Sequence, residues 1–193
     1  TRLGFQQVLC NVNYTDRKAV VNSFAYSNDG GICFGGREEA AKAFVIPQLE
    51  FMTNDTWEII AGLGEDNSFP LLLKTQFSKG RLYILTIPED YGALYHLPRK
   101  ILLPIRQVFQ KNSPVVFDSY SKVAFFQYDN DCFAIHSFRP WYDEVSISLK
   151  KGYNAVKDLV NGNTVKAQKE NENFVIRLRL APGINYVYQL IRE

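Results

Sequence analysis

The residues with the clearest chemical potential lie in a glycine-rich segment, Gly31-Ile-Cys33-Phe-Gly35. This G-x-C-x-G spacing has the form of a nucleophile elbow, in which flanking glycines allow the sharp strand-to-helix turn that exposes a thiol. The segment 37–43 that follows has high helix propensity, and the N-terminus of such a helix would lower the pKa of the thiol. Cys33 is therefore a candidate nucleophile. The alternative is a small buried residue in a tight turn.

A cysteine nucleophile also needs a paired base, and the two histidines do not supply one in a familiar pattern. His96 is followed by Leu-Pro and His136 by Ser-Phe, so neither has a glutamate two residues later. The sequence holds no HxxxH, HxH or Cys–His cluster, which are the spacings typical of metal sites. We therefore expect packing or surface roles for both histidines, and neither a metal nor a cofactor.

Acidic residues gather in turn-like segments. Glycoside hydrolysis requires two carboxyl groups that flank a cleft at a set separation. The acidic candidates are Glu65-Asp66, Glu89-Asp90, Asp129 with Asp131, and Asp143-Glu144. Turn acids usually cap or solvate the chain, so we predict no catalytic pair. Asp129-Asn-Asp131 lacks the spaced oxygen ligands of a calcium loop and indicates a β-turn.

One aromatic cluster, Phe138-Arg-Pro-Trp-Tyr142, is suited to sugar stacking. Exposed Trp141 and Tyr142 would lie flat against a pyranose ring, and Arg139 and Asp143 would bind its hydroxyl groups. These four residues are the predicted carbohydrate-binding site. The alternative is an inter-strand loop that packs onto another domain.

The composition limits what these residues can belong to. The chain has 193 residues, of which 46% are hydrophobic and 22% charged, so it can bury a core. Its net charge of +2 excludes nucleic-acid binding driven by bulk charge. No apolar run approaches the roughly 20 residues of a membrane span. An odd count of 3 cysteines without a CxxC pair argues against a disulfide framework.

The N-terminal part mixes strand and helix signals. A Gly-containing link between two apolar runs, 71–77 and 81–87, predicts a hairpin whose second strand is buried on both faces. A helix is expected over 93–110, with Pro98 in its first turn and Pro104 as a kink or restart. Further expectations are strands at 5–12 and 18–26 joined by a turn at 13–17, the helix at 37–43, an end to that element at Pro47, and strand-like segments within 48–63.

The pattern changes after Asn112-Ser-Pro114, which we take as a domain boundary. Eight short strands are predicted at 115–117, 122–128, 132–138, 144–149, 155–160, 164–167, 174–180 and 186–191. Phe174, Ile176, Leu178 and Leu180 alternate with outward-facing Arg177 and Arg179. The fold class is therefore α/β over residues 1–112 followed by an all-β sandwich over 113–193.

Four segments suggest a family. The hairpin around Ser78-Lys79-Gly80 resembles one in the glutamine-amidotransferase-like domain of bacterial β-galactosidase-type enzymes. The segments 122–138, 156–165 and 181–183 are similar to hairpins and a turn of the small β-sandwich that ends those proteins. The resemblance covers roughly residues 67–193 and implies an incomplete amidotransferase-like unit before the sandwich. The amidotransferase family carries a reactive cysteine together with a His-x-Glu pair. This chain has no His-x-Glu pair. The β-galactosidase-type resemblance places the glycosidase acids in an upstream barrel.

The resulting hypothesis is a non-catalytic accessory C-terminal region of a larger glycoside hydrolase-like protein, bracing its catalytic domain or mediating oligomer contacts. The alternatives are a carbohydrate-binding module that uses Trp141 and Tyr142, and a cysteine hydrolase that uses Cys33. The chain starts without an initiator Met or signal peptide, which suggests a segment of a longer protein. The expected partners are upstream domains, a polysaccharide or a second copy. The resemblance implies a periplasmic or extracellular location.

Overall fold

The computed structural model describes residues 12–27, 34–51, 58–64, 69–77, 79–171 and 173–192. Cys33 and residues 5–11 of the strand expected at 5–12 lie outside these ranges. The chain divides into two compact units, Thr1–Ile105 and Arg106–Glu193. The boundary expected near residue 112 lies a few residues further along and stays a prediction for limited proteolysis.

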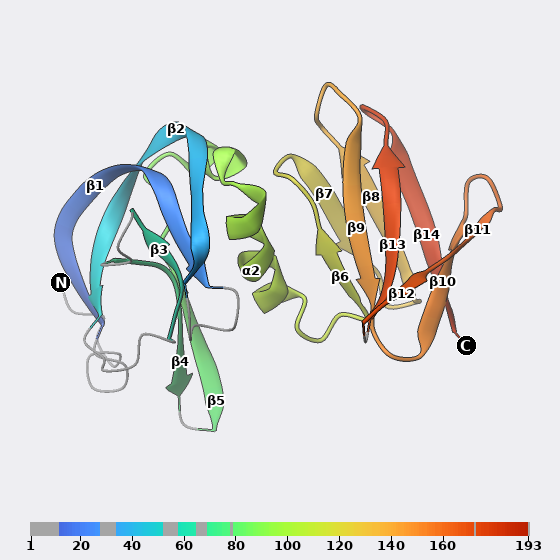
Figure 1. Ribbon diagram of the computed structural model, residues 1–193, viewed down its shortest axis with the longest axis horizontal. Coiled ribbons are helices and arrows are strands. Elements are labelled where there is room, and N and C mark those ends of the chain that lie inside the picture. Colours follow the sequence, from blue (N-terminus) through green and yellow to red (C-terminus); the bar gives the residue numbers. More distant parts are fainter. Residues whose placement is uncertain are drawn as a thin grey trace. The chain divides into compact units, whose positions relative to one another are not determined.

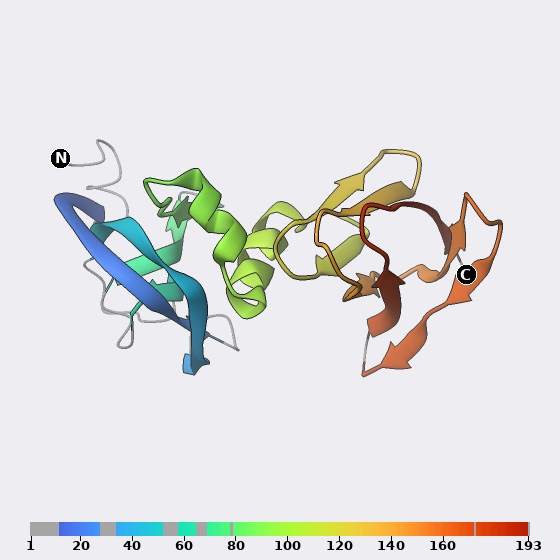
Figure 2. The ribbon, with the colours of Figure 1, turned by 90° about the horizontal axis from the view of Figure 1, so that it is seen from above.

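Unit 1 is built on one antiparallel sheet of five strands in the order β2-β1-β3-β4-β5. The first two strands are long and curved, which both views show (Figure 1 and Figure 2). Phe24 and Phe44 meet in its core as an edge-to-face pair, with ring centroids 5.2 Å apart. The strands are β1 Val12–Ser27, β2 Phe34–Phe51, β3 Ile59–Leu63, β4 Phe69–Phe77 and β5 Gly80–Leu85.

The turn expected at 13–17 is wrong, because β1 continues through it. The β1–β2 register shifts between Tyr14 and Lys18, and Asp16 adopts a φ of 57°. Thr15 Oγ1 donates to the carbonyl of Gln48 at 2.8 Å. Polar residues that resembled a loop therefore form an irregularity inside a long strand.

The helix expected at 37–43 is also wrong, since β2 runs through this segment. Phe44 and Ile46 are buried and Val45 is exposed, which is the two-residue alternation of a strand. Pairing with β1 has overridden the local helix propensity. Pro47 does not end the element, because β2 lies at the edge of the sheet, where proline is tolerated.

The predicted hairpin is confirmed, with β4 and β5 paired from Leu72↔Leu85 to Phe77↔Gly80. The expectation that its second strand is buried on both faces is wrong. β5 is an edge strand of the sheet, and its residues are exposed or half-buried.

The predicted helical region forms a 3-10 helix, η2 Tyr91–His96, and an α-helix, α2 Arg99–Phe109. Pro98 directly precedes α2, and its carbonyl accepts hydrogen bonds from the amides of Ile101 and Leu102, each at 3.0 Å. Pro104 lies within α2. In the described residues of unit 1 the sheet is antiparallel throughout, so the structure shows a strand-rich unit, and the expected amidotransferase-like α/β fold is not shown.

Unit 2 contains all eight strands that the sequence predicted, and also β12, which the sequence analysis missed. The missed strand is three residues long, and within the described residues it pairs with β13 alone. The strands are β6 Val115–Asp118, β7 Val123–Gln127, β8 Cys132–Ser137, β9 Asp143–Leu149, β10 Tyr153–Asp158, β11 Thr164–Lys166, β12 Gln168–Glu170, β13 Asn173–Leu180 and β14 Asn185–Arg192.

These strands form two antiparallel sheets, β11-β10-β14-β8-β7 and β12-β13-β9-β6, with a shared apolar core. Successive ring contacts link β6, β7, β8 and β14, with centroid distances of 4.8, 5.5 and 5.4 Å. In β13, Ile176, Leu178 and Leu180 are buried while Arg177 and Arg179 are exposed, as predicted. Unit 2 is thus a β-sandwich with its own core.

Candidate binding surface at the β8–β9 loop

Three loops that cross from one sheet of the sandwich to the other meet at one end of unit 2. They are residues 119–122 after β6, 138–142 after β8, and 181–184 after β13. The amide of Phe138 donates to the carbonyl of Lys122 at 2.9 Å. The amide of Gly183 donates to the carbonyl of Ser137 at 3.0 Å. Lys122 and Gly183 adopt φ values of 61° and 68°, which permit tight turns. Backbone contacts therefore hold the three loops together.

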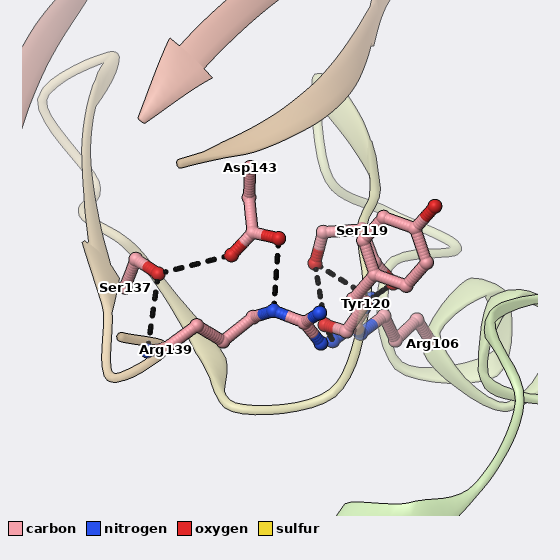
Figure 3. Close-up of polar contacts among 6 residues, drawn as sticks. All are labelled: Arg106, Ser119, Tyr120, Ser137, Arg139 and Asp143. Carbon is pink, nitrogen blue, oxygen red and sulfur yellow. Dashed lines mark hydrogen bonds and ion pairs between the residues drawn. The ribbon is translucent and has the colours of Figure 1, made fainter. Parts of the chain in front are cut away.

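A buried carboxylate anchors the β8–β9 loop (Figure 3). The side chain of Asp143 is 2% exposed, and its Oδ2 accepts a hydrogen bond from Ser137 Oγ at 3.2 Å. Arg139 Nε lies 2.8 Å from Asp143 Oδ1, as an ion pair without the alignment of a hydrogen bond. The Arg139 amide donates to Ser137 Oγ at 3.3 Å. The last residue of β8 and the first of β9 are thus tied together across the loop.

A second arginine fixes the neighbouring β6–β7 loop. Arg106, in the last turn of α2, donates through Nη1 to the carbonyl oxygen and the hydroxyl of Ser119, at 2.5 and 2.9 Å. Its Nη2 donates to the carbonyl of Tyr120 at 3.0 Å. Ser119 is fully buried, so these bonds satisfy polar groups that water does not reach.

Aromatic rings surround the arginine side chains. The Arg139 guanidinium carbon lies 4.7 Å from the centroid of the Tyr120 ring and 4.9 Å from that of Trp141. The Arg179 guanidinium carbon lies 4.6 Å from the centroid of the Tyr142 ring. The residues that carry these rings are exposed: Tyr120 by 42%, Trp141 by 56% and Tyr142 by 59%. We call the set Tyr120, Arg139, Trp141, Tyr142 and Arg179 the aromatic–arginine surface.

The structure brings the four predicted carbohydrate-binding residues together, with a clear division among them. Trp141 and Tyr142 are exposed, whereas Arg139 and Asp143 have side chains only 17% and 2% exposed. Arg139 and Asp143 therefore shape the loop from within. Sequence reasoning missed Tyr120 and Arg179 as neighbours. The only available signal was that Arg179 faces outward on β13.

The remaining chemical candidates are not part of the aromatic–arginine surface, and Cys33 and the pair Glu65-Asp66 lie outside the described residues. His96 ends η2 in unit 1, and His136 Nδ1 lies 2.7 Å from Asn185 Oδ1 with its ring against Phe138. Cys132 is a buried free thiol in β8. Among the described residues, no three His, Cys, Asp or Glu side chains cluster as metal ligands. No helix in the described part of the chain is long and apolar enough to cross a membrane.

The sandwich with its crossover loops matches a known family. Residues 114–189 match the model of a family described as "Probable glycosyl hydrolase, C-terminal domain". The match runs from the residue before β6 into β14, so it covers the strands of the sandwich. It supports a C-terminal region of a glycosyl hydrolase-like protein. No curated protein and no solved structure matches the chain.

Proposed function

We propose that this chain is a non-catalytic accessory C-terminal region of a larger glycoside hydrolase-like protein, where it braces the catalytic domain or mediates oligomer contacts. The observation that carries the proposal is the match of residues 114–189 to a glycosyl hydrolase C-terminal domain. The finer comparison with β-galactosidase-type enzymes belongs to the same proposal and rests on the resemblance of the hairpins.

The composition of the aromatic–arginine surface supports a binding role over a catalytic one. Glycoside hydrolysis needs two carboxyl groups on either side of the scissile bond. The surface contains arginines and aromatic rings, and the carboxylate beneath it is already engaged by Ser137 and Arg139. Such a surface can hold a ligand or a neighbouring protein, but it offers no acid–base pair.

Activity measurements on the full chain test this proposal. We expect no turnover of aryl glycosides or of glutamine above the blank. Turnover that Cys33→Ala abolishes would overturn the accessory role in favour of a cysteine hydrolase. The structure gives that hydrolase little support, because the helix expected to follow Cys33 is the strand β2. Rapid labelling by iodoacetamide near pH 6, lost in Cys33→Ala, would be an independent sign of a reactive thiol.

Sedimentation velocity on the full chain separates the two accessory roles. A concentration-dependent dimer or higher assembly is expected if the chain mediates oligomer contacts. A monomer at all concentrations leaves the bracing role, in which the partner is the upstream part of the parent protein.

A second candidate function is carbohydrate binding, and the specific observation that favours it is the exposure of Trp141 and Tyr142. Aromatic side chains present a large apolar face at little cost in conformational entropy, which suits them to stack on a sugar ring. Arginine contacts hold both rings in place.

A further inference from the structure

The two arginines of the aromatic–arginine surface differ in how much of their charge a ligand can reach. Arg139 is largely buried and faces Asp143. Arg179 is exposed on β13, and in the described part of the chain no carboxylate lies within ion-pair distance of it. Its partner in the β9 ladder is Glu144, yet the pair makes no ion pair. Arg177, two residues away, pairs instead with Glu170 at 2.5 Å.

The position of Arg179 on a ring leaves its donors usable. A guanidinium that stacks on an aromatic ring uses its flat face, and its N–H groups point outward in its own plane. Those N–H groups form a fork that matches a carboxylate or sulfate group in a bidentate way. Arg179 lies 4.6 Å from the Tyr142 ring centroid, so this fork stands beside an exposed aromatic ring.

Trp141, which precedes Tyr142 in the chain, supplies a second exposed aromatic ring and an apolar platform. It follows Pro140 and precedes Tyr142 in a loop whose ends are tied by Asp143, Ser137 and Arg139. A platform of this kind loses little entropy on binding, because the loop is already ordered by buried contacts.

We infer that Trp141, Tyr142 and Arg179 form a binding site for an anionic saccharide, a sugar ring that carries a carboxylate or a sulfate group. The rings stack on the sugar, Arg179 binds the anion, and Arg139 is a positioning residue that holds Trp141. This inference deepens the carbohydrate-binding candidate above and depends on it.

Affinity electrophoresis of the full chain in gels that contain polygalacturonate, dextran sulfate or dextran tests the inference. We expect retardation by one of the two anionic polymers and none by dextran. Retardation by polygalacturonate identifies a carboxylate ligand, and retardation by dextran sulfate identifies a sulfate ligand. Arg179→Gln and Trp141→Ala are each expected to weaken binding at least about fivefold, the scale of one charge-assisted hydrogen bond or stacked ring.

Arg177→Gln is the matched control, because it removes the same charge from the same strand at a position that faces no ring of this surface. It should bind like the unmodified chain. Equal losses in Arg177→Gln and Arg179→Gln would show general attraction of a basic protein to a polyanion and would overturn the site. If Trp141→Ala unfolds, Tyr142→Ala tests the platform instead.

The other outcomes separate this inference from the functions proposed above. Equal retardation by dextran would overturn the anionic class while keeping a neutral-sugar platform. No retardation by any polymer would overturn the site and the carbohydrate-binding candidate. It would leave the accessory role, which the activity and sedimentation measurements test on their own.

Discussion

Each end of the sandwich has an arginine, an aspartate and a tyrosine in contact, but the two groups differ in solvent exposure. At the crossover-loop end, Arg139 pairs with Asp143 beneath Tyr120, with side chains 17% and 2% exposed. At the opposite end, Arg192 pairs with Asp131 at 3.0 Å, with side chains 72% and 33% exposed. Tyr153 Oη donates to Asp131 Oδ1 at 2.8 Å and lies beneath the same arginine.

The difference teaches that similar geometry does not imply a similar energy. An exposed ion pair contributes little, because water solvates both partners almost as well. A buried pair that loses one partner leaves the other without its solvation, which is costly. We therefore expect the crossover-loop end to depend strongly on its carboxylate, and the opposite end to depend on it weakly.

The largest effect is expected from Asp143→Ala. The change leaves the largely buried Arg139 without its counter-charge and removes the partner of Ser137. It should lower the free energy of unfolding by about 3–5 kcal/mol. Chemical denaturation followed by circular dichroism measures the loss. Asp131→Ala is the matched change at the exposed end and should barely move the midpoint. Equal effects of the two changes would show that burial does not separate the two ends.

A comparable effect is expected from Ile176→Ala, which empties a packed site in the core that both ends share. The free energy of unfolding should fall by about 2–5 kcal/mol. Arg177→Ala, at the next residue of β13 on the outer face, should resemble an ordinary surface change.

Hydrogen exchange extends this test to both ends of the sandwich. With one shared core, Ile176→Ala should speed the exchange of the slowest amides near Asp143 and near Asp131 together. Faster exchange at one end alone would mean that the ends unfold independently.

A smaller effect is expected in alkali from Tyr188, which packs in the same core against Phe133. Burial, with the nearby charge of Asp158, raises the pKa of Tyr188 from 10.0 to about 12. Between these values the unfolded chain loses the proton first, so stability falls as the pH rises from about 10 to 12. Tyr188→Phe keeps the ring and should reduce this loss. Denaturation midpoints at pH 8 and pH 11 give the comparison, and an unchanged alkaline loss would assign it to other groups.

The smallest effect is expected in acid at the exposed end. The hydrogen bond from Tyr153, followed by that from Arg192, holds the pKa of Asp131 below its usual 3.8. The stabilisation is present above about pH 4 and is lost as the pH falls through the folded-state pKa. Thermal melts from pH 5 to pH 3 should show a slightly weaker acid dependence for Asp131→Asn and for Tyr153→Phe. A stronger acid dependence in either variant would contradict this assignment.

The sequence predicted most of unit 2 because its signals are local. In β13 the alternation from Phe174 to Leu180 specifies which side chains face a core, whatever covers them. The turn residues between the strands then set the boundaries, and only the short strand β12 was missed. In unit 1 the same reasoning failed at 37–43, where a helix-favouring composition gave way to the pairing of β2 with β1.

Part of the candidate surface could also be predicted from the sequence, and part could not. Arg139, Trp141, Tyr142 and Asp143 are neighbours in one loop, so the sequence by itself could group them. Only the tertiary structure brought Tyr120 and Arg179 to them, because the crossing of loops between two sheets joins residues from distant strands. The tertiary structure also decided which of these side chains are buried. A carboxylate after a turn looks solvent-facing in sequence, but Asp143 starts a strand that packs against the second sheet, and its buried side chain forms an ion pair with Arg139.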